Sequence, residues 1–217
     1  MTWQDKFINK VVCGDCLELL KEIPDKSIDL VLTDPPYGIE LEYDIYKDTS
    51  ENWITLFSCV LPELIRISKC VIMPCCRFVK LKWIYSNYPP DWLICWYKGS
   101  VGHRSNIGFN DWEPHLVYGK PNKIMHDYFK TSPTPFNNGH PCPKPIKWAQ
   151  WFIEKSTNQG DLVLDCFLGS GTTAVACKQL NRNFIGIEIS PDYCKIAESR
   201  LKAVPEKLMI FEKEVQK

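Results

Sequence analysis

The sequence predicts an α/β fold with a mostly parallel β-sheet, formed by one domain that spans residues 1–217. Short apolar runs such as LVL and LVLD are typical of strands that are buried on both faces of a sheet. These runs alternate with longer segments whose apolar residues recur at helical spacing, a pattern that predicts βαβ units. Hydrophobic residues make up 45% of the 217 residues, which is enough for a packed core.

The first half of the chain carries three predicted strands with helices between them. Ser50 is the expected N-cap of the second helix, and Pro62 within that helix predicts a kink. In chain order the predicted elements are a strand at 10–15, a helix at 16–23, a strand at 29–34, a helix at 50–68, a strand at 70–75 and a helix at 78–87.

The second half begins with two strands that pair around a glycine-containing loop. Residues 121–145 contain six prolines and little periodicity, so we expect them to form an ordered loop or linker. A helix follows Pro145, and the last helix has Ser190 as its N-cap. In chain order the predicted elements are strands at 92–98 and 115–120, a helix at 146–157, a strand at 161–167, a helix at 171–180, a strand at 183–188 and a helix at 190–202.

Composition and patterning argue against several classes of protein. A basic start followed by an apolar run is absent, as is any stretch of 18 apolar residues, so we expect no signal peptide, no membrane span and a cytoplasmic protein. The eleven cysteines are scattered, and many lie inside apolar runs, which favours reduced, buried thiols over a disulfide framework. The Cys13-Gly14-Asp15-Cys16 segment lacks a second pair of ligands, so we expect no metal.

The net charge is zero, but the charges are unevenly distributed. Residues 1–60 carry 5 basic and 12 acidic groups, residues 61–130 carry 10 and 5, and residues 131–217 carry 11 and 9. The basic middle third fits either a solvated face or a surface for a polyanion, and the charge count does not choose between them. Eight Trp, nine Tyr and ten Phe exceed the needs of a core of this size, so some rings are candidates for stacking on bases.

Residues 165–174 read DCFLGSGTTA and join a predicted strand to a predicted helix. Gly169, Gly171 and Ala174 have the G-x-G-x-x-G/A spacing of a nucleotide-binding loop, and Glu188 ends the next strand, where it can accept hydrogen bonds from a ribose. The alternative is a tight turn that needs glycine for its geometry alone. A Walker-type loop is excluded because no lysine follows the glycines.

Two cofactors that contain a nucleoside fit this loop, a dinucleotide and S-adenosylmethionine. A dinucleotide would bring its anionic pyrophosphate to the helix N-terminus, where Asp165 would repel it. The same carboxylate suits a cationic aminoacyl group. The loop therefore favours S-adenosylmethionine.

Residues 30–38 read LVLTDPPYG, so a carboxylate, a rigid turn and an aromatic ring follow a buried strand. The exocyclic amine of a base is a poor nucleophile, because its lone pair is delocalised into the ring. Asp34 and the carbonyl of Pro35, which has no competing N–H, could accept both N–H bonds and aim the lone pair at a methyl group. Pro36 fixes the turn, and Tyr37 offers a ring face to a base, unless the segment is simply a proline-rich turn with a packed tyrosine.

These residues together resemble the amino-directed DNA methyltransferases, specifically the permuted beta group, in which a DPPY motif precedes the cofactor loop. The resemblance extends from about Val11 to Leu201 and includes DPPY at 34–37, HPCPKP at 140–145 and DCFLGSGTT at 165–173. It implies a Rossmann-like, S-adenosylmethionine-dependent methyltransferase fold in a single methyltransferase domain. It also implies a mostly parallel seven-stranded sheet with an antiparallel hairpin.

The resemblance also implies roles for individual residues. Asp34 and the Pro35 carbonyl hold the target amine, Pro36 shapes the motif, and Tyr37 stacks on the base. Asp15, in the GD segment with Cys16 beside it, meets the adenine amine of the cofactor. The other implied cofactor-binding residues are Lys144, Asp165, Phe167, Gly169, Gly171, Thr172, Thr173 and Glu188.

A large insert for target recognition is absent from the sequence, so we expect DNA contacts from shorter loops. Residues 38–52, 99–114 and 121–139 are long enough to contact DNA outside the pocket. Basic residues in or next to the last two loops are candidates for phosphate contacts, although each lysine also fits a plain surface charge. These candidates are Lys98, His103, Arg104, Lys120, Lys123 and Lys130.

The sequence therefore predicts an S-adenosylmethionine-dependent DNA methyltransferase that acts on an exocyclic amine within a short specific sequence of double-stranded DNA. Asp34 at the start of the motif favours adenine N6, and cytosine N4 is the alternative, since cytosine N4 enzymes of this kind more often start the motif with serine. A nicotinamide oxidoreductase would share the glycine loop but has no use for DPPY, and a catalytically idle DNA-binding module is the remaining alternative. Expected partners are DNA and, as a candidate, a restriction nuclease, with the protein a monomer or homodimer.

Overall fold

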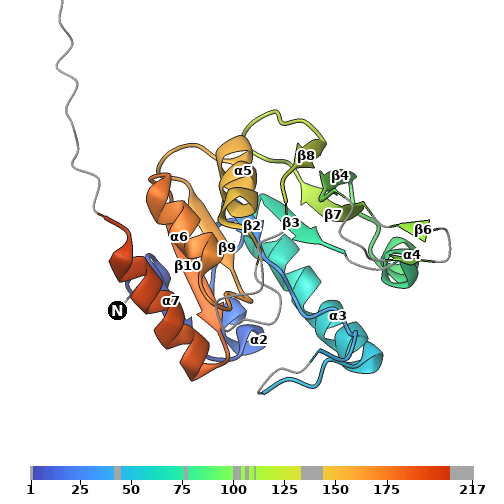
Figure 1. The fold of residues 1–217 in the computed structure, drawn as a ribbon. Coiled ribbons are helices and arrows are strands. Elements are labelled where there is room, and N and C mark those ends of the chain that lie inside the picture. Colours follow the sequence, from blue (N-terminus) through green and yellow to red (C-terminus); the bar gives the residue numbers. More distant parts are fainter. Residues whose placement is uncertain are drawn as a thin grey trace, which may run out of the picture.

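In the described part of the chain, eight strands form a central sheet with helices packed on both of its faces, so the predicted α/β class is confirmed (Figure 1). The computed structural model describes residues 2–41, 45–75, 78–99, 104–105, 108–109, 111–132 and 144–205. The strand order is β1-β10-β9-β2-β3-β7-β4-β8. In chain order these strands are β1 (Lys10–Cys13), β2 (Leu30–Leu32), β3 (Cys70–Pro74), β4 (Trp92–Tyr97), β7 (Trp112–Gly119), β8 (Tyr128–Lys130), β9 (Leu162–Asp165) and β10 (Asn183–Glu188).

Five neighbouring strands, β1, β10, β9, β2 and β3, run parallel to one another. Their carboxyl ends therefore meet at one edge of the sheet, which we call the carboxyl edge, and the opposite edge is the amino edge. The strand β7 runs antiparallel to both β3 and β4, as expected for the predicted strand pair. The chain between β4 and β7, which includes the two-stranded hairpin of β5 (Arg104–Ser105) and β6 (Gly108–Phe109), therefore leaves from the carboxyl edge.

Two apolar clusters, one on each face of the sheet, form the core. Val31, Val71 and Leu164 belong to the first cluster, whereas Leu30 and Val163 belong to the second, as alternation along a strand requires. The helices over the first cluster are α1 (Trp3–Phe7), α2 (Cys16–Leu19), the short 3₁₀ helix η1 (Leu20–Glu22), α3 (Ser50–Ile67) and α4 (Phe78–Asn87). Those over the second are α5 (Ile146–Ser156), α6 (Thr172–Gln179) and α7 (Pro191–Ala203) (Figure 1).

Over the described residues, the sheet has eight strands instead of the seven expected from the sequence. The additional strand, β8, lies in the proline-rich segment that the sequence predicts as a loop, and it pairs in parallel with β4. Phe129 holds β8 in place, because its buried ring stacks on Trp151 with 4.8 Å between the ring centroids. A three-residue strand with one inward side chain carries too little periodicity to be predicted.

The start of α3 also differs from the prediction. Thr49, and not Ser50, is the N-cap, and its hydroxyl accepts a hydrogen bond from the Asn52 amide at 3.2 Å. The Ser50 hydroxyl is used elsewhere, because it donates to the carbonyl oxygen of Gly38 at 3.3 Å. The helix continues through the exposed Pro62 to Ile67.

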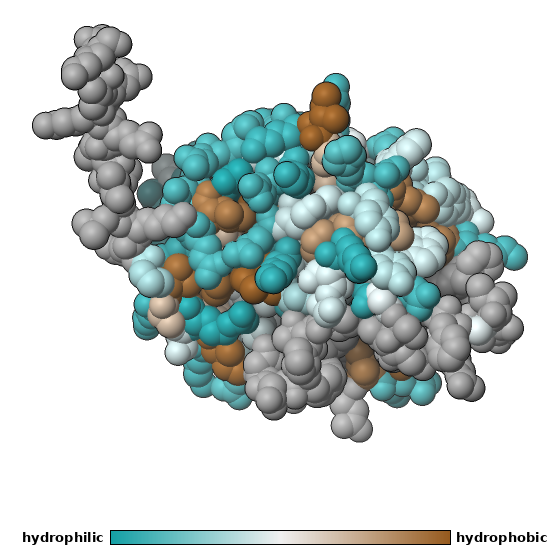
Figure 2. Space-filling model, turned by 45° about the horizontal axis from the view of Figure 1, so that its top comes forward, coloured by the Kyte–Doolittle hydropathy of each residue, from teal (hydrophilic) through white to brown (hydrophobic). Residues whose placement is uncertain are grey.

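Figure 2 shows a face on which hydrophilic residues predominate and hydrophobic residues form small separate patches. Among the described residues, none of the helices combines the length and the apolar character that a bilayer crossing requires.

Gly171, which precedes α6, is required by the packing of α6 against α7. Its φ of 88° lies in the left-handed region, and a Cβ atom added there would lie 2.8 Å from the Cβ of Ala197 on α7. Any side chain at this position would therefore force α7 away from the glycine loop.

We predict that Gly171→Ala lowers the free energy of unfolding more than Gly160→Ala does. Both variants carry the cost of a left-handed residue, roughly 1–2 kcal/mol, because Gly160 has a φ of 84° with no heavy atom within 4 Å of an added Cβ. Only Gly171→Ala adds the overlap with Ala197, typically about 1–3 kcal/mol. Urea denaturation of both variants measures the difference, and equal losses would contradict the packing role of Gly171.

Candidate active site

The carboxyl edge brings together two loops that are far apart in the sequence. The strands β2 and β9 are hydrogen-bonded neighbours, with Leu30 opposite Val163 and Val31 opposite Leu164. The segments that follow these strands carry Asp34 and Asp165. The buried Thr33 hydroxyl donates to Asp165 Oδ1 at 2.7 Å and so links the two loops directly.

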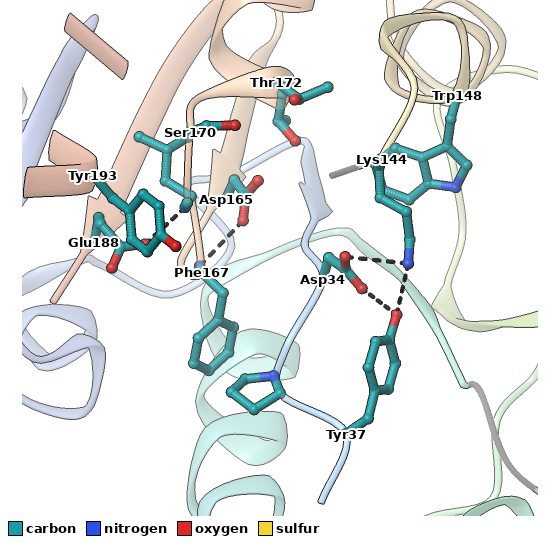
Figure 3. Close-up of a pocket in the computed structure, with 14 residues that line it drawn as sticks. Asp34, Tyr37, Lys144, Trp148, Asp165, Phe167, Ser170, Thr172, Glu188 and Tyr193 are labelled. Carbon is teal, nitrogen blue, oxygen red and sulfur yellow. Dashed lines mark hydrogen bonds and ion pairs between the residues drawn. The ribbon is translucent and has the colours of Figure 1, made fainter. Parts of the chain in front are cut away.

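A pocket lies where these two loops meet, with an empty volume of about 760 Å³ that includes its open mouth. The pocket is lined by Asp34, Pro36, Tyr37, Lys144, Trp148, Asp165, Phe167, Leu168, Gly169, Ser170, Thr172, Thr173, Glu188 and Tyr193 (Figure 3). The DPPY motif, the lysine of HPCPKP and the glycine loop therefore face one cavity.

Asp165 places a buried carboxylate at the floor of this pocket. Burial raises its pKa, hydrogen bonds from Thr173, Thr33 and the Phe167 amide oppose the shift, and the nearby Asp34 raises it further, to about 6. The Phe167 amide donates to Oδ1 at 3.1 Å. A buried acid with a raised pKa gains from the arrival of a cation.

The glycine loop is held to Glu188 at the end of β10. The amide of Gly169 donates to Glu188 Oε2 at 2.7 Å, and the amide of Ser190 donates to Oε1 at 2.9 Å. Gly169 has a φ of 52° and lines the pocket. Gly171 is not part of the pocket lining, because the position that its Cβ would occupy faces Ala197 on α7. Its expected contact with a cofactor therefore has no support here.

The carboxylate of Asp34 is engaged on both oxygens (Figure 3). The Tyr37 hydroxyl donates to Oδ1, and the Lys144 ammonium lies 3.2 Å from Oδ2. Lys144 also donates to the Tyr37 hydroxyl oxygen at 2.9 Å and lies 5.2 Å from the centroid of the tyrosine ring. Lys144 thus contacts the catalytic motif, although the sequence places it with the cofactor-binding residues.

Lys144 belongs to a chain of alternating charges that continues away from the pocket. Its ammonium lies 3.5 Å from Glu113 Oε1, and Lys98 donates to Glu113 Oε2 at 2.9 Å. Burial alone would raise the pKa of Glu113, but Lys144 and Lys98 outweigh burial and lower it to about 2. The Trp96 ring flanks both lysines, 5.9 Å from Lys144 and 5.3 Å from Lys98.

Glu113 is fixed by its place on β7. It pairs in register with Trp96, and its carbonyl oxygen lies 3.4 Å from His115 Nδ1. His115 Nε2 accepts from the Trp148 indole at 2.7 Å, so Nδ1 carries the proton and donates to Glu113. Burial lowers the pKa of His115 to about 3, which keeps this ring neutral.

The turn after DPPY is held by a side chain that the sequence analysis missed. The buried Asp48 accepts from the amides of Gly38 at 2.6 Å and Ile39 at 3.0 Å. Gly38 has a φ of 62°, and an added Cβ would lie 2.7 Å from Trp53. An acid ten residues after Gly38 and directly before the N-cap residue Thr49 was the available signal.

Some predicted site residues lie outside the pocket lining. Asp15 is exposed, and its carboxylate caps α2 by accepting from the Leu17 amide at 2.9 Å. Cys16 is buried in the core, and Pro35 lines a small apolar cavity between DPPY and α3. The roles of Asp15, Cys16 and the Pro35 carbonyl stay predictions.

The predicted DNA contacts are divided between the two edges of the sheet. Lys98 directly follows Tyr97, the last residue of β4, and Lys130, the last residue of β8, pairs with Tyr97. Both lysines therefore lie at the carboxyl edge. Lys120 follows the end of β7, where Gly119 pairs with Cys70, and the amide of Asn122 bonds the carbonyl oxygen of Ser156 at 3.0 Å. Lys120 and Lys123 therefore lie at the amino edge. Seven residues of β7 separate this edge from the pocket, about 24 Å at roughly 3.4 Å per residue.

This placement argues against Lys120 and Lys123 as contacts of a duplex that enters the pocket. Lys98 is mostly buried in its ion pair with Glu113, which leaves Lys130 as the exposed candidate on the carboxyl edge. Arg104 lies in β5, and its side chain is outside the described part of the structure, as are His103 and residues 140–143 of HPCPKP. Loops 38–52 and 99–114 both leave from the carboxyl edge.

Comparisons with known proteins agree with the geometry. Residues 80–199, more than half of the chain, match the N6/N4 family described as DNA methylase. The type II methyltransferase M.HpaI of Haemophilus parainfluenzae is 26% identical and covers 88% of this chain and 74% of its own. The DNA adenine methyltransferase YhdJ of Escherichia coli (strain K12) is 29% identical and covers 88% and 82%.

Two solved structures share the fold. The M1.HpyAVI–SAM complex has a TM-score of 0.65 and 25% sequence identity, and the match covers 88% of this chain and 98% of that one. The cytosine-N4-specific PvuII DNA methyltransferase has a TM-score of 0.70 and 20% identity, and the match covers 91% and 87%. At 20% identity the second likeness supports the fold alone.

We predict that Asp165→Asn changes the pH dependence of stability. The folded-state pKa of Asp165, about 6, lies above the ordinary value of 3.8, so the wild-type protein loses stability as pH rises from 3.8 through about 6. A shift of about two units corresponds to at most about 3 kcal/mol over that window. Thermal unfolding at a series of pH values should show Asp165→Asn gaining on the wild type through this window and running parallel above it. A difference that does not vary with pH would contradict the assignment.

Proposed function

The chain belongs to the DNA methylase family, and from that premise we propose that it methylates the exocyclic N6 amine of adenine in duplex DNA. The observation that carries the proposal is the meeting of Asp34 and Tyr37 with the glycine loop in one pocket. An acceptor for an amine, a ring for a base and a nucleoside-binding loop are the parts that this reaction needs. The order of DPPY before the glycine loop supports the permuted beta group.

S-adenosylmethionine is the methyl donor of this chemistry, and when bound it supplies an electrophilic methyl group on a cationic sulfonium. The pocket fits such a ligand, because its floor is the buried Asp165 carboxylate. We assign Asp165 to the cationic aminoacyl end and Glu188 to the ribose hydroxyls. Phe167 offers an apolar surface beside them. Asp15 is assigned to the adenine amine of the cofactor from the sequence alone.

Asp34 and the Pro35 carbonyl have the task of holding the target amine. Two acceptors on its N–H bonds favour a pyramidal nitrogen whose lone pair points away from them, toward the methyl group. As the N–C bond forms and the S–C bond breaks, positive charge grows on the amine nitrogen. The Asp34 carboxylate therefore binds the transition state more tightly than the substrate and is the nearest acceptor for the departing proton.

Adenine is the preferred base, and cytosine N4 is the alternative. Asp34 at the first position of DPPY supports adenine, and so does the 29% identity to a relative named as a DNA adenine methyltransferase. The fold is shared with a cytosine-N4-specific enzyme, so the fold does not discriminate. A short recognition sequence, a cognate nuclease and a monomeric or homodimeric state stay predictions.

The test is to incubate the purified protein with S-adenosylmethionine and unmethylated duplex DNA of mixed sequence. The DNA is then digested to nucleosides and analysed by mass spectrometry. The expected product is N6-methyladenine. N4-methylcytosine instead would overturn the choice of base, and the absence of both methylated bases would overturn the proposed function.

We predict that Asp34→Ala leaves the affinity for S-adenosylmethionine near that of the wild type but lowers the single-turnover rate of methyl transfer. Losing one preorganised charged partner of a transition state typically lowers the rate about 10²–10³-fold. The matched control is Asp25→Ala, which removes a side chain with 73% exposure near the amino edge. Near wild-type transfer by Asp34→Ala would show that DPPY is a structural turn.

Variants of Tyr37 should separate the ring from its hydroxyl. Tyr37→Ala removes the stacking face, which is worth roughly 1–3 kcal/mol per base, and should weaken binding of DNA that contains the target. Tyr37→Phe and Tyr37→Trp keep the face and should retain most of the activity, although Tyr37→Phe loses the bonds to Asp34 and Lys144. Binding titrations and single-turnover assays on the three variants provide the measurement. If Tyr37→Trp is as inactive as Tyr37→Ala, the stacking role is wrong.

Charge reversal should reveal which edge of the sheet meets DNA. Lys130→Glu, on the carboxyl edge, should weaken binding to all sequences alike and reduce the dependence of affinity on salt by roughly one phosphate contact. Lys120→Glu makes the same change of charge on the amino edge and should leave the salt dependence as it is. Fluorescence anisotropy over a range of salt concentrations measures both. The reverse ranking would place DNA on the amino edge.

A further inference from the structure

One oxygen of Glu113 lacks the hydrogen bond that its burial requires. Among the described residues, Glu113 Oε1 is buried and has no hydrogen-bond partner, while Oε2 accepts from Lys98. Buried acceptors are normally satisfied, so an unsatisfied one needs an explanation. The Lys144 ammonium lies 3.5 Å from Oε1, just beyond the usual hydrogen-bond distance.

Lys144 is instead committed to the catalytic motif. Its ammonium lies 3.2 Å from Asp34 Oδ2 and donates to the Tyr37 hydroxyl at 2.9 Å, and that hydroxyl in turn donates to Asp34 Oδ1. Both oxygens of Asp34 are therefore engaged by groups of the protein. An amine that donates to Asp34 Oδ2 therefore competes with the Lys144 ammonium for that oxygen.

We propose that Glu113 is a positioning residue that takes over the Lys144 ammonium when the target amine binds Asp34. This inference rests on the proposed function. A movement of about half an ångström would bring Lys144 within hydrogen-bond distance of Glu113 Oε1. In the proposed exchange this movement lengthens the contact of Lys144 with Asp34 Oδ2, so that this oxygen can accept the N–H of the base.

The geometry keeps the free-energy cost of this exchange low. Leaving a buried charge unpaired costs several kcal/mol. Lys144 never becomes unpaired, because its ammonium lies between two carboxylates and only changes which of them it approaches more closely. The side chains of Lys144 and Glu113 are 7% and 8% exposed, so water cannot easily replace either partner.

Glu113 has a closer cationic partner than Lys144. Lys98 already lies 2.9 Å from Glu113 Oε2, and β7 and His115 fix the position of Glu113. Lys144 is a second cation near Glu113, at the longer distance of 3.5 Å, and it also contacts Asp34. We therefore regard its ammonium as shared between the two carboxylates. Asp34, Lys144, Glu113 and Lys98 together carry no net charge, so the exchange leaves the local charge unchanged.

The test uses Glu113→Gln in the full-length protein, with single-turnover methylation of duplex DNA at saturating S-adenosylmethionine. The variant keeps the shape of the side chain but attracts Lys144 weakly, so Lys144 should stay on Asp34. We expect transfer to slow roughly ten- to a hundredfold, by analogy with the loss seen when the outer partner of a metal-binding side chain is removed. Affinity for S-adenosylmethionine should not change. The matched control is Glu154→Gln, an equal change of charge on the exposed face of α5.

A second variant separates positioning from a merely structural role. Lys144→Met removes the cation that Glu113 is proposed to take over, so Glu113→Gln should have little further effect in that background. Because no lysine competes with the amine for Asp34 in the double variant, it should transfer methyl groups faster than Glu113→Gln alone. A merely structural role predicts instead that each loss of rate follows a loss of melting temperature. Melting temperatures of all four proteins identify any loss that reflects unfolding.

The outcomes for this inference and for the proposed function are distinguishable. If the wild type does not methylate DNA, the proposed function fails. If the wild type is active and Glu113→Gln transfers at the same rate, or if Lys144→Met gives no rescue of a folded Glu113→Gln protein, only the exchange of Lys144 is overturned.

Discussion

The parallel pairing of β2 with β9 determines where the chemistry of this protein can occur. Two strands more than a hundred residues apart in the sequence lie side by side, and each ends in an acidic loop. The Thr33 hydroxyl, which is fully buried, bonds Asp165 Oδ1 at 2.7 Å and fixes the distance between the loops. Ligands of open α/β sheets bind at such a point, where strands from the two halves of the chain meet. The pocket follows from this pairing.

Much of this arrangement could be predicted from the sequence. The apolar runs identified the strands, and in a parallel sheet their carboxyl ends share one edge, so DPPY and the glycine loop had to converge. The part played by Glu113 could not be predicted, because an ion pair between residues 31 positions apart leaves no periodic signal. The packing of Gly171 against Ala197 could not be predicted for a similar reason, since it depends on how α7 lies against the glycine loop.

The positions of the basic residues could not be predicted from the charge count alone. The middle third of the chain is basic, but β7 carries Lys120 and Lys123 to the amino edge and leaves Lys98 and Lys130 on the carboxyl edge. This division follows from the antiparallel direction of β7. The predicted strand pair already contained that information, whereas the charge count did not use it. The direction of the strands, and not the number of basic residues, determines at which edge of the sheet each lysine lies.

The charges around the pocket also explain why a cationic ligand suits it. The described side chains there include four carboxylates, Asp34, Glu113, Asp165 and Glu188, and two lysines, Lys98 and Lys144. The mutual repulsion of Asp34 and Asp165 contributes to the raised pKa of Asp165, after the larger effect of burial. A sulfonium with an ammonium group would relieve that repulsion from one side, while Lys144 relieves it from the other. In the proposed exchange, Lys144 moves from Asp34 toward Glu113 when the base binds. Asp34 is then paired with a cation in the free protein and has an oxygen available to the target amine in the complex.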